Sequence, residues 1–331
     1  MWFKNLTGFA EKNPQYVKDN LEIQGEYLLS KINNKKFCFG SLKTPTLKEL
    51  REIIDLTKTK SVKISIKEVV ANVQELHADP KNKNAVFQAA SQFNLLEMVG
   101  PHITPEQGVD RYEQDRTQGP ACAISCGAGT IYRNYFVEVN KQIGQTSTNQ
   151  LDCLAPIGKA LGNDESKLWS MENGYALANQ EGLLKINKKL ASLNDDQKEE
   201  LKGKLKVGIQ WNTEVTISKD KHIVTQVYCS ALPVAYSRIE SMYWESFARL
   251  ILDATYEATL YAGLLNMEKT GCNLVYLTLF GGGAFGNDKQ WIFDALEKAL
   301  LKFENSGLAV RMVSYGRSNL GLVEWIERLD K

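Results

Sequence analysis

Leu274-Val-Tyr-Leu-Thr-Leu-Phe280 runs straight into Gly281-Gly-Gly-Ala-Phe-Gly286, and this junction decides the fold. The first seven residues are almost wholly apolar, as in a strand that is buried on both faces of a sheet. The glycines mark a turn, and the residues from Asp288 to Phe303 have the pattern of a helix. In a parallel sheet such a turn lies at the carboxyl edge, where ligands bind.

Further strands and helices on both sides of this junction extend the same pattern. Ala85 to Ala90, His222 to Cys229 and Leu308 to Val313 are short apolar segments that predict strands. Ile239 to Asn266 predicts an amphipathic helix between two of them. The alternation predicts an α/β fold, with helices on both faces of a mostly parallel or mixed sheet in three layers.

The first sixty residues are expected to form an extension packed on this core. Glu26 to Ile32 and Lys36 to Gly40 predict a β-hairpin around an Asn-Asn turn. Thr46-Leu-Lys-Glu49 has the sequence of a capping box, which predicts a helix through about Thr57, and Ser61 to Ile66 predicts a strand. We therefore expect an extension over residues 1–60, a core over 61–331, and a charged helical insertion around 140–206.

Composition narrows the function classes. The 331 residues include 40 basic and 39 acidic side chains, for a net charge of +1, so neither nucleic acid nor a membrane is an expected partner. The six cysteines form no Cys-x-x-Cys pair, and no metal site is predicted. Reduced thiols and the absence of a signal-peptide pattern predict a cytoplasmic protein, with a secreted bacterial effector that acts in a host cytosol as an alternative.

The glycine-rich turn has two interpretations. Glycines let backbone N–H groups approach a diphosphate closely, and the N-terminus of the following helix adds a favourable dipole. The alternative is a tight strand-to-helix turn in which Asn287 or Asp288 caps the helix. The spacing fits neither the Rossmann fingerprint nor the P-loop.

Two polar segments are candidates for chemistry. After the strand that ends near Ala90, Gln92 and Asn94 carry amides suited to ribose hydroxyls and Phe93 offers a ring face, although these groups could also cap loops. Further on, Gly108 to Ala123 contains three acids, and glycosidic cleavage needs a carboxylate. The preferred catalytic acid is Asp115, followed by Asp110 and Glu113, with surface ion pairing as the alternative. Arg133 could clamp a phosphate or pair with a structural acid.

The order of these parts resembles the macrodomain family, whose members bind ADP-ribose or hydrolyse ADP-ribosyl groups and which extends to the poly(ADP-ribose) glycohydrolases. Gln88-Ala-Ala-Ser91 stands where the family has an Asn-Ala-Ala-Asn-like turn, and Phe280 to Gly286 stands at its second glycine loop. Asn72 stands where the family has an acid that reads adenine. With these replacements, and without the Gln-Glu-Glu signature of the glycohydrolases, the sequence resembles a divergent branch of the family. Such a branch could remove ADP-ribose from an amino-acid side chain, of which arginine is one candidate.

The resemblance implies an ADP-ribosyl hydrolase that acts on an ADP-ribosylated protein, with ADP-ribose as ligand or product and no required cofactor. Asp110 and Asp115 could support Mg²⁺, but the sequence demands no metal. A reader module without catalysis, or an unrelated nucleotide-dependent α/β enzyme, is the alternative. The expected ligand-binding residues are Asn72, Ser91, Gln92, Phe93, Asn94, Thr117, Gln118, Gly119, Arg133, Gly281, Gly282, Gly283, Ala284, Phe285, Gly286 and Asn287.

Overall fold

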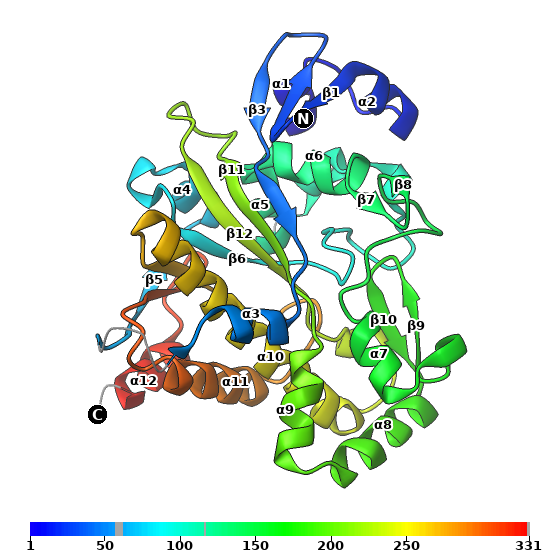
Figure 1. Ribbon diagram of the computed structural model, residues 1–331, viewed down its shortest axis with the longest axis vertical. Helices are drawn as coiled ribbons and strands as arrows, with labels where there is room; N and C mark the ends of the chain where they lie inside the picture. Colours follow the sequence, from blue (N-terminus) through cyan, green and yellow to red (C-terminus); the bar gives the residue numbers. More distant parts are fainter. Residues whose placement is uncertain (57–61, 116, 330–331) are drawn as a thin grey trace.

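A seven-stranded mixed sheet forms the centre of the molecule (Figure 1). The computed structural model describes residues 1–56, 62–115 and 117–329. The strand order is β4-β11-β12-β6-β13-β14-β5. The strands are β4 (Ser41–Lys43), β5 (Ser65–Val70), β6 (Val86–Ala90), β11 (Gly208–Glu214), β12 (Ile223–Cys229), β13 (Leu274–Leu277) and β14 (Ala309–Ser314).

Five neighbouring strands of the sheet are parallel, from β12 through β6, β13 and β14 to β5. Only β11 runs against its neighbours β4 and β12. Ala90 at the end of β6 pairs with Cys229 at the end of β12, so both strands finish at one edge. The predicted strands around Ala85–Ala90, His222–Cys229, Leu274–Phe280 and Leu308–Val313 are confirmed, although β13 ends at Leu277.

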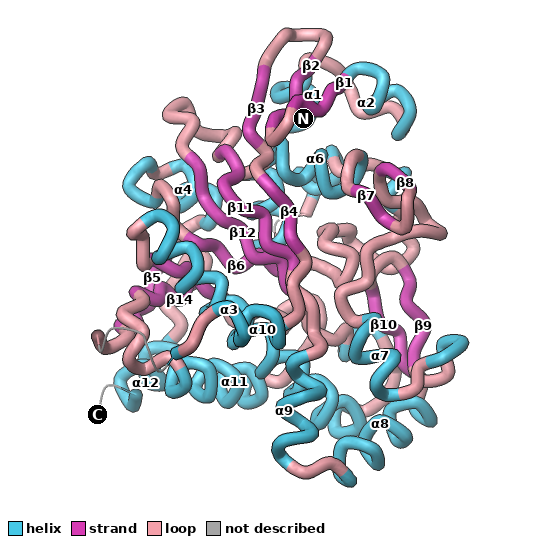
Figure 2. The backbone as a smooth tube through the Cα atoms, in the orientation of Figure 1, coloured by secondary structure: helices cyan, strands magenta, loops and turns pink. Residues whose placement is uncertain are grey.

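Helices cover both faces of the sheet, which confirms the predicted three layers (Figure 2). On β6, Phe87 stacks on His77 of α4 while the next residue, Gln88, hydrogen-bonds Thr259 of α10, because successive side chains point to opposite faces. On the α10 side lie α3 (Leu47–Ile53), α10 (Ser241–Thr270) and α11 (Lys289–Lys302), and α12 (Leu320–Leu329) contacts β5. On the α4 side lie α4 (Val73–Ala78), α5 (Gln118–Ser125) and α6 (Gly127–Tyr135).

The N-terminal extension is shorter than expected. It comprises the helices α1 (Trp2–Thr7) and α2 (Pro14–Asn20) and the strands β1 (Leu21–Gln24), β2 (Tyr27–Ser30) and β3 (Lys36–Cys38). The three strands form a small sheet apart from the central one (Figure 1). The predicted hairpin is present, and Asn34 takes the positive φ of 56° that its turn requires. The extension ends near residue 40, because β4 already pairs with β11 in the main sheet.

A largely helical insertion follows α6 and returns to the sheet at β11. Its elements are β7 (Glu138–Val139), β8 (Gln142–Ile143), α7 (Ala155–Leu161), β9 (Trp169–Glu172), β10 (Tyr175–Ala178), α8 (Gln180–Ser192) and α9 (Asp195–Gly203). The insertion packs on the core through α8 and α9, which contact α10. Its hairpin β9–β10 reaches back toward the loop after β6, where Phe93 N–H donates to Gly174 O at 3.0 Å.

Residues 91–135 are rich in Gly, Pro, Gln, Asn and Asp, and they contain two helices, α5 and α6, as well as the 3-10 turns η3 (Pro105–Gln107) and η4 (Asp110–Gln114). Both helices are buried on nearly all sides, and glycines and polar side chains are among their buried residues. The helix expected to reach Thr57 ends at Ile53, and the strand expected from Ser61 begins at Ser65; Thr57 and Ser61 themselves lie outside the described residues. No described helix is long and apolar enough to cross a membrane.

The predicted capping box of α3 is present and allows a first test of the fold. Thr46 Oγ1 accepts from Glu49 N at 3.2 Å, and Glu49 Oε2 accepts from Thr46 N at 2.7 Å. Thr46→Ala is expected to lower the free energy of unfolding by about 1 kcal/mol, because a helix N–H loses its acceptor. Urea unfolding checks this, with the exposed Lys48→Ala on the same helix as control. An unchanged midpoint for Thr46→Ala would contradict the assigned role of the cap.

Candidate functional site

A cavity of about 890 Å³ lies at the carboxyl edge of the sheet, bounded by the loops that follow β6, β12 and β13. Chain segments far apart in sequence line it together. They are Ala90, Ser91, Gln92, Glu97, Met98, Val99, Ile103, Arg111, Tyr112, Gln114, Asp115, Thr117, Gln118, Gly119, Pro120, Tyr175, Ala231, Tyr236, Thr278, Leu279, Phe280, Gly281, Gly283, Ala284 and Phe285. The cavity is therefore where the ends of parallel strands place a ligand site.

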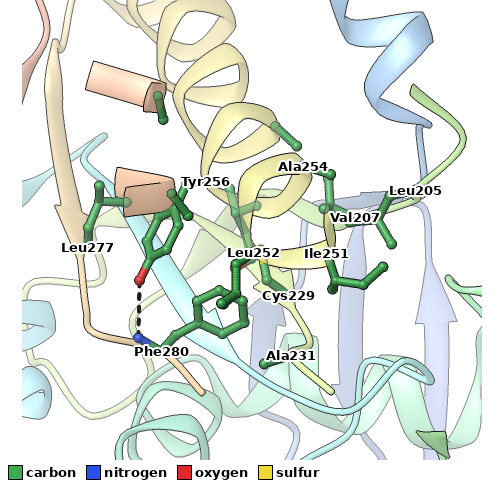
Figure 3. Packing of buried hydrophobic residues seen from close by; sticks show 14 of the residues in the cluster. Leu205, Val207, Cys229, Ala231, Ile251, Leu252, Ala254, Tyr256, Leu277 and Phe280 are labelled. Atoms are coloured by element: carbon green, nitrogen blue, oxygen red, sulfur yellow. Dashed lines mark hydrogen bonds between the residues drawn. The ribbon is translucent and has the colours of Figure 1, made fainter. Parts of the chain in front are cut away.

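The glycine loop after β13 is anchored to α10 through Tyr256, whose hydroxyl meets Phe280 N (Figure 3). The Tyr256 hydroxyl donates to Thr278 O at 2.7 Å and accepts from Phe280 N at 3.3 Å. At the far end of the loop, the Asn287 amide donates to Leu232 O at 2.8 Å and to Gly281 O at 3.2 Å. Asn287 thus shapes the loop, and Asp288 caps α11 by accepting from Gln290 N.

This loop leaves backbone donors free beside the cavity. Gly281, with φ of 81°, Gly283 and Ala284 have N–H groups that find no acceptor among the described residues. Buried or lining N–H groups without a protein partner are suited to an anionic ligand. Gly282 and Gly286 do not line the cavity. Gly286 has φ of 68° and packs tightly against Ala235, because a Cβ atom placed on Gly286 would lie 2.7 Å from Ala235 Cβ.

The N-terminus of α5 supplies a second set of donors on the same cavity. Thr117 is the N-cap, and the N–H groups of Gln118 and Gly119 have no acceptor within the described part of the chain. A Cβ on Gly119 would lie 2.1 Å from Ala90 O, so only glycine lets this helix end approach β6 so closely. Two sources of N–H donors, with a helix dipole behind one of them, are suited to a diphosphate.

An aromatic cluster borders the cavity next to the glycine loop. Tyr175, Tyr236 and Phe285 contact one another, with ring centroids between 5.1 and 5.6 Å apart. Tyr175 comes from the insertion, and its hydroxyl donates to Met98 O at 2.6 Å. The preceding Gly174 has φ of 82° and a Cβ position 2.5 Å from Asn94 Oδ1, so this hairpin turn is fitted tightly to the loop after β6. The cluster offers ring faces for a nucleobase.

Of the three predicted catalytic acids, only Asp115 lines the cavity. It is half-buried and accepts from Thr117 N at 2.8 Å, directly before α5. Burial raises the pKa of Tyr175, and the neighbouring Tyr236 and Asp115 raise it further. Asp115 therefore lies close to the aromatic cluster. The structure corrects the predictions for Asp110 and Glu113, which do not line the cavity. Both face the N-terminal extension, where Asp110 accepts a hydrogen bond from Phe3 N and Glu113 accepts one from Trp2 N.

Several expected ligand-binding residues hold the scaffold instead. Asn72 caps α4 by accepting from Gln74 N at 2.9 Å. Phe93 is buried in the core, and Asn94 is fully buried, accepts from Leu96 N and donates to Gln150. Arg133 has no exposed surface and cannot clamp a ligand phosphate. Ser91, Gln92, Thr117, Gln118, Gly119, Gly281, Gly283, Ala284 and Phe285 do line the cavity.

Glu97 is a cavity residue that sequence reasoning missed. It is 2% exposed, and burial raises its pKa to about 8 against the opposing effects of Arg133 and Tyr112. Neither of its carboxyl oxygens has a hydrogen-bond partner among the described residues. The only signal in the sequence is a single acid between apolar residues, in Leu95-Leu-Glu-Met-Val99. Tyr112 and Tyr175 were also missed, because nothing local sets them apart.

The fold and the cavity together define an α/β protein with a cavity at the carboxyl edge of a mixed sheet. The chain is similar to poly(ADP-ribose) glycohydrolase from Thermomonospora curvata, with 10% identity, a TM-score of 0.49 and 95% of each chain covered. It is also similar to the Deinococcus radiodurans glycohydrolase in complex with ADP-ribose, with 11% identity, a TM-score of 0.44, and 87% of this chain and 92% of that chain covered. No protein family model and no curated protein matches the sequence.

Proposed function

We propose that the protein binds an ADP-ribosyl group in this cavity and hydrolyses the bond that joins it to a protein side chain. The observation that carries the proposal is that two sets of N–H groups without an acceptor among the described residues border one cavity: those of Gly281, Gly283 and Ala284, and those at the N-terminus of α5. The diphosphate would bind these donors. Tyr236 and Phe285 would contact the adenine, and the Gln92 amide, whose Nε2 has no partner within the described residues, would bind a ribose hydroxyl.

The carboxylate of Asp115 is suited to glycosidic cleavage because it lies in the cavity beside the helix end that would hold the diphosphate. In the proposed reaction the bond between the anomeric carbon and the acceptor atom breaks, and the oxygen of a water molecule bonds to that carbon. Asp115 stabilises the oxocarbenium-like centre and takes one proton from the water, and the acceptor leaves with a proton. Arginine is one acceptor in this proposal, alongside side chains linked through oxygen.

Calorimetric titration with ADP-ribose, ADP and adenosine tests the binding half of the proposal. ADP-ribose is expected to bind more tightly than either control, because only ADP-ribose occupies both the N–H donors and the distal sugar position. Equal binding of ADP and ADP-ribose would contradict a site for the distal ribose. Absence of binding by all three would remove the diphosphate assignment of the glycine loop.

Asp115→Asn tests the catalytic half. The variant is expected to lose roughly 100-fold or more in turnover of ADP-ribosylated proteins while binding ADP-ribose normally, because only the proton acceptor is removed. Release of ADP-ribose from arginine-, serine- and glutamate-linked substrates is the measurement. Glu113→Gln is the matched control, since this acid lies on the preceding turn and binds Trp2 N instead of lining the cavity. Full turnover by Asp115→Asn would show that another group serves the anomeric carbon.

A further inference from the structure

The second acid of the cavity, Glu97, has the environment of a proton donor. It lies in the loop after β6, five residues before His102. Its side chain packs against the start of α5, because a Cβ atom placed on Gly119 would lie 3.4 Å from Glu97 Cγ. Its side chain is almost wholly buried and yet lines the cavity. Neither carboxyl oxygen has a hydrogen-bond donor within the described part of the chain. A buried polar group normally has its hydrogen bonds satisfied, so this exception needs an explanation.

The groups around Glu97 hold it in place without satisfying it. Arg133 Nη2 of α6 lies 3.6 Å from Glu97 Oε1, which is an ion pair but too long for a good hydrogen bond. The Tyr112 hydroxyl of η4 accepts from Glu97 N at 2.9 Å. Tyr228 of β12 and Cys122 of α5 are the other titratable groups that feel its charge. Residues of α5, α6, β12 and η4 therefore lie around Glu97, and among the described residues Arg133 is the one that pairs with its carboxyl group.

Arg133 cannot move closer to complete the pair. Its Nε donates to Leu95 O at 3.0 Å and its Nη2 to Thr130 Oγ1 at 3.1 Å. Its guanidinium also stacks on the Tyr228 ring, 3.6 Å from the centroid. These contacts orient the guanidinium along the core, and Nη1 has no acceptor among the described residues. The remaining attraction is too weak to offset the burial of the carboxyl group, whose pKa is about 8.

We propose that Glu97 donates the proton to the leaving atom when the ADP-ribosyl bond is cleaved. This role rests on the proposed hydrolysis and adds a second carboxyl group to it. As the bond between the anomeric carbon and the acceptor oxygen breaks, the Glu97 proton moves to that oxygen and Glu97 becomes a carboxylate. Asp115 takes a proton from the attacking water, and solvent returns this proton to Glu97 after the products leave.

Two carboxyl groups in contrasting surroundings suit these two tasks. Glu97 is buried beside apolar residues such as Leu96, which is fully buried, and is therefore protonated at neutral pH. Asp115 is half-buried and accepts a backbone hydrogen bond, so it is suited to the role of a proton acceptor. Arg133 and Tyr112 are positioning residues in this scheme, since they act on Glu97 and not on the substrate.

The test compares two leaving groups in the full-length protein and in Glu97→Gln. An alkyl oxygen, as in serine-linked ADP-ribose, needs a proton to leave, whereas para-nitrophenolate leaves without one. Glu97→Gln is expected to lose roughly 100-fold to 10,000-fold in kcat on the serine-linked substrate but less than about 10-fold on the para-nitrophenyl one. ADP-ribose binding by calorimetry should be unchanged. A purely structural role would affect both substrates equally, and that result would overturn the proposal.

The pH dependence gives a second, independent readout. Wild-type turnover of the serine-linked substrate should fall as the pH rises through about 8, because the proton donor is lost. Glu97→Asp keeps a carboxyl group and should retain this limb, and it also serves if Glu97→Gln does not fold. A wild-type protein that cleaves the substrate with no such limb, or an equally active Glu97→Gln, overturns the role of Glu97 alone. A wild-type protein without turnover on either substrate overturns the proposed hydrolysis as well.

Discussion

Gly119→Ala is expected to remove ADP-ribose binding and to weaken the fold. The added methyl group would lie 2.1 Å from Ala90 O, the last carbonyl of β6, which is far inside van der Waals contact. Since the obstacle is backbone, the end of α5 must move away from the sheet. We expect the free energy of unfolding to fall by about 3 kcal/mol. ADP-ribose affinity should fall by roughly 100-fold or more, because the N–H donors of Gln118 and Gly119 move with the helix.

Urea unfolding and calorimetry measure the two effects on the same samples. Gly321→Ala is the matched control: its added methyl group would meet only Asn319 Oδ1, at 3.6 Å, in a helix that contributes no residue to the cavity. This control should keep wild-type affinity and stability or gain slightly, since alanine favours a helix. If Gly119→Ala bound ADP-ribose as tightly as the control, the helix end would not hold the diphosphate, and the glycine loop alone would remain as its site.

The strands and long helices of the core could be predicted because their signals are local. β6, β12, β13 and β14 are short apolar runs, and α11 has an apolar stripe that packs against α10. α5 and α6 could not be predicted in the same way. A Cβ atom on Gly127 would lie 2.7 Å from the Trp2 ring, and one on Gly129 would lie 3.0 Å from Thr213 Oγ1, so both glycines pack closely against distant parts of the chain. A segment with such glycines has the composition of a loop, and its helices depend on contacts that no local pattern shows.

The same distinction applies to the candidate site, where residues with a local sequence signal could be predicted and residues placed by long-range contacts could not. The glycine loop and Asp115 could be predicted, because a strand that ends in glycines and an acid next to Gly119-Pro120 are visible in the sequence. Arg133 was expected among the ligand-binding residues, and no local pattern could correct this: its neighbours Glu97 and Tyr228 are 36 and 95 positions away, and only the folded chain shows that it lies in the core. The unsatisfied state of Glu97 depends on four elements together, so no local pattern could reveal it.

The insertion also contributes to the site in a way that its composition concealed. The segment was expected to be a charged helical insertion, and its hairpin β9–β10 between α7 and α8 brings Tyr175 to the cavity. The turn at Gly174 is anchored by Phe93 N and fits against Asn94. The buried amides of Asn94 and Gln150, linked at 2.7 Å, continue this anchor into the insertion. The insertion therefore forms part of the wall of the cavity through Tyr175.

Glu97→Gln is expected to make the protein more stable at neutral pH while it lowers the proposed hydrolase activity. In the folded chain the pKa of Glu97 is about 8, whereas an ordinary glutamate titrates near 4.5. Between these values the folded state retains a proton that the unfolded state has lost, so stability falls as the pH rises from about 4.5 to 8. A glutamine does not titrate, and the variant avoids this loss. The difference in unfolding free energy should reach about 3 kcal/mol at pH 7.

Urea unfolding of both proteins at several pH values between 5 and 8 measures this difference directly. The two stability curves should converge near pH 5 and diverge steadily above it, with the variant the more stable. Glu106→Gln is a useful control, because this acid accepts hydrogen bonds from Ser147 and has a lowered pKa, so its replacement should destabilise the protein at neutral pH. If Glu97→Gln were instead less stable at every pH, Glu97 would be ionised and paired with Arg133 in the folded protein. A carboxylate in that state holds no proton to donate, so the same result would also overturn its catalytic role.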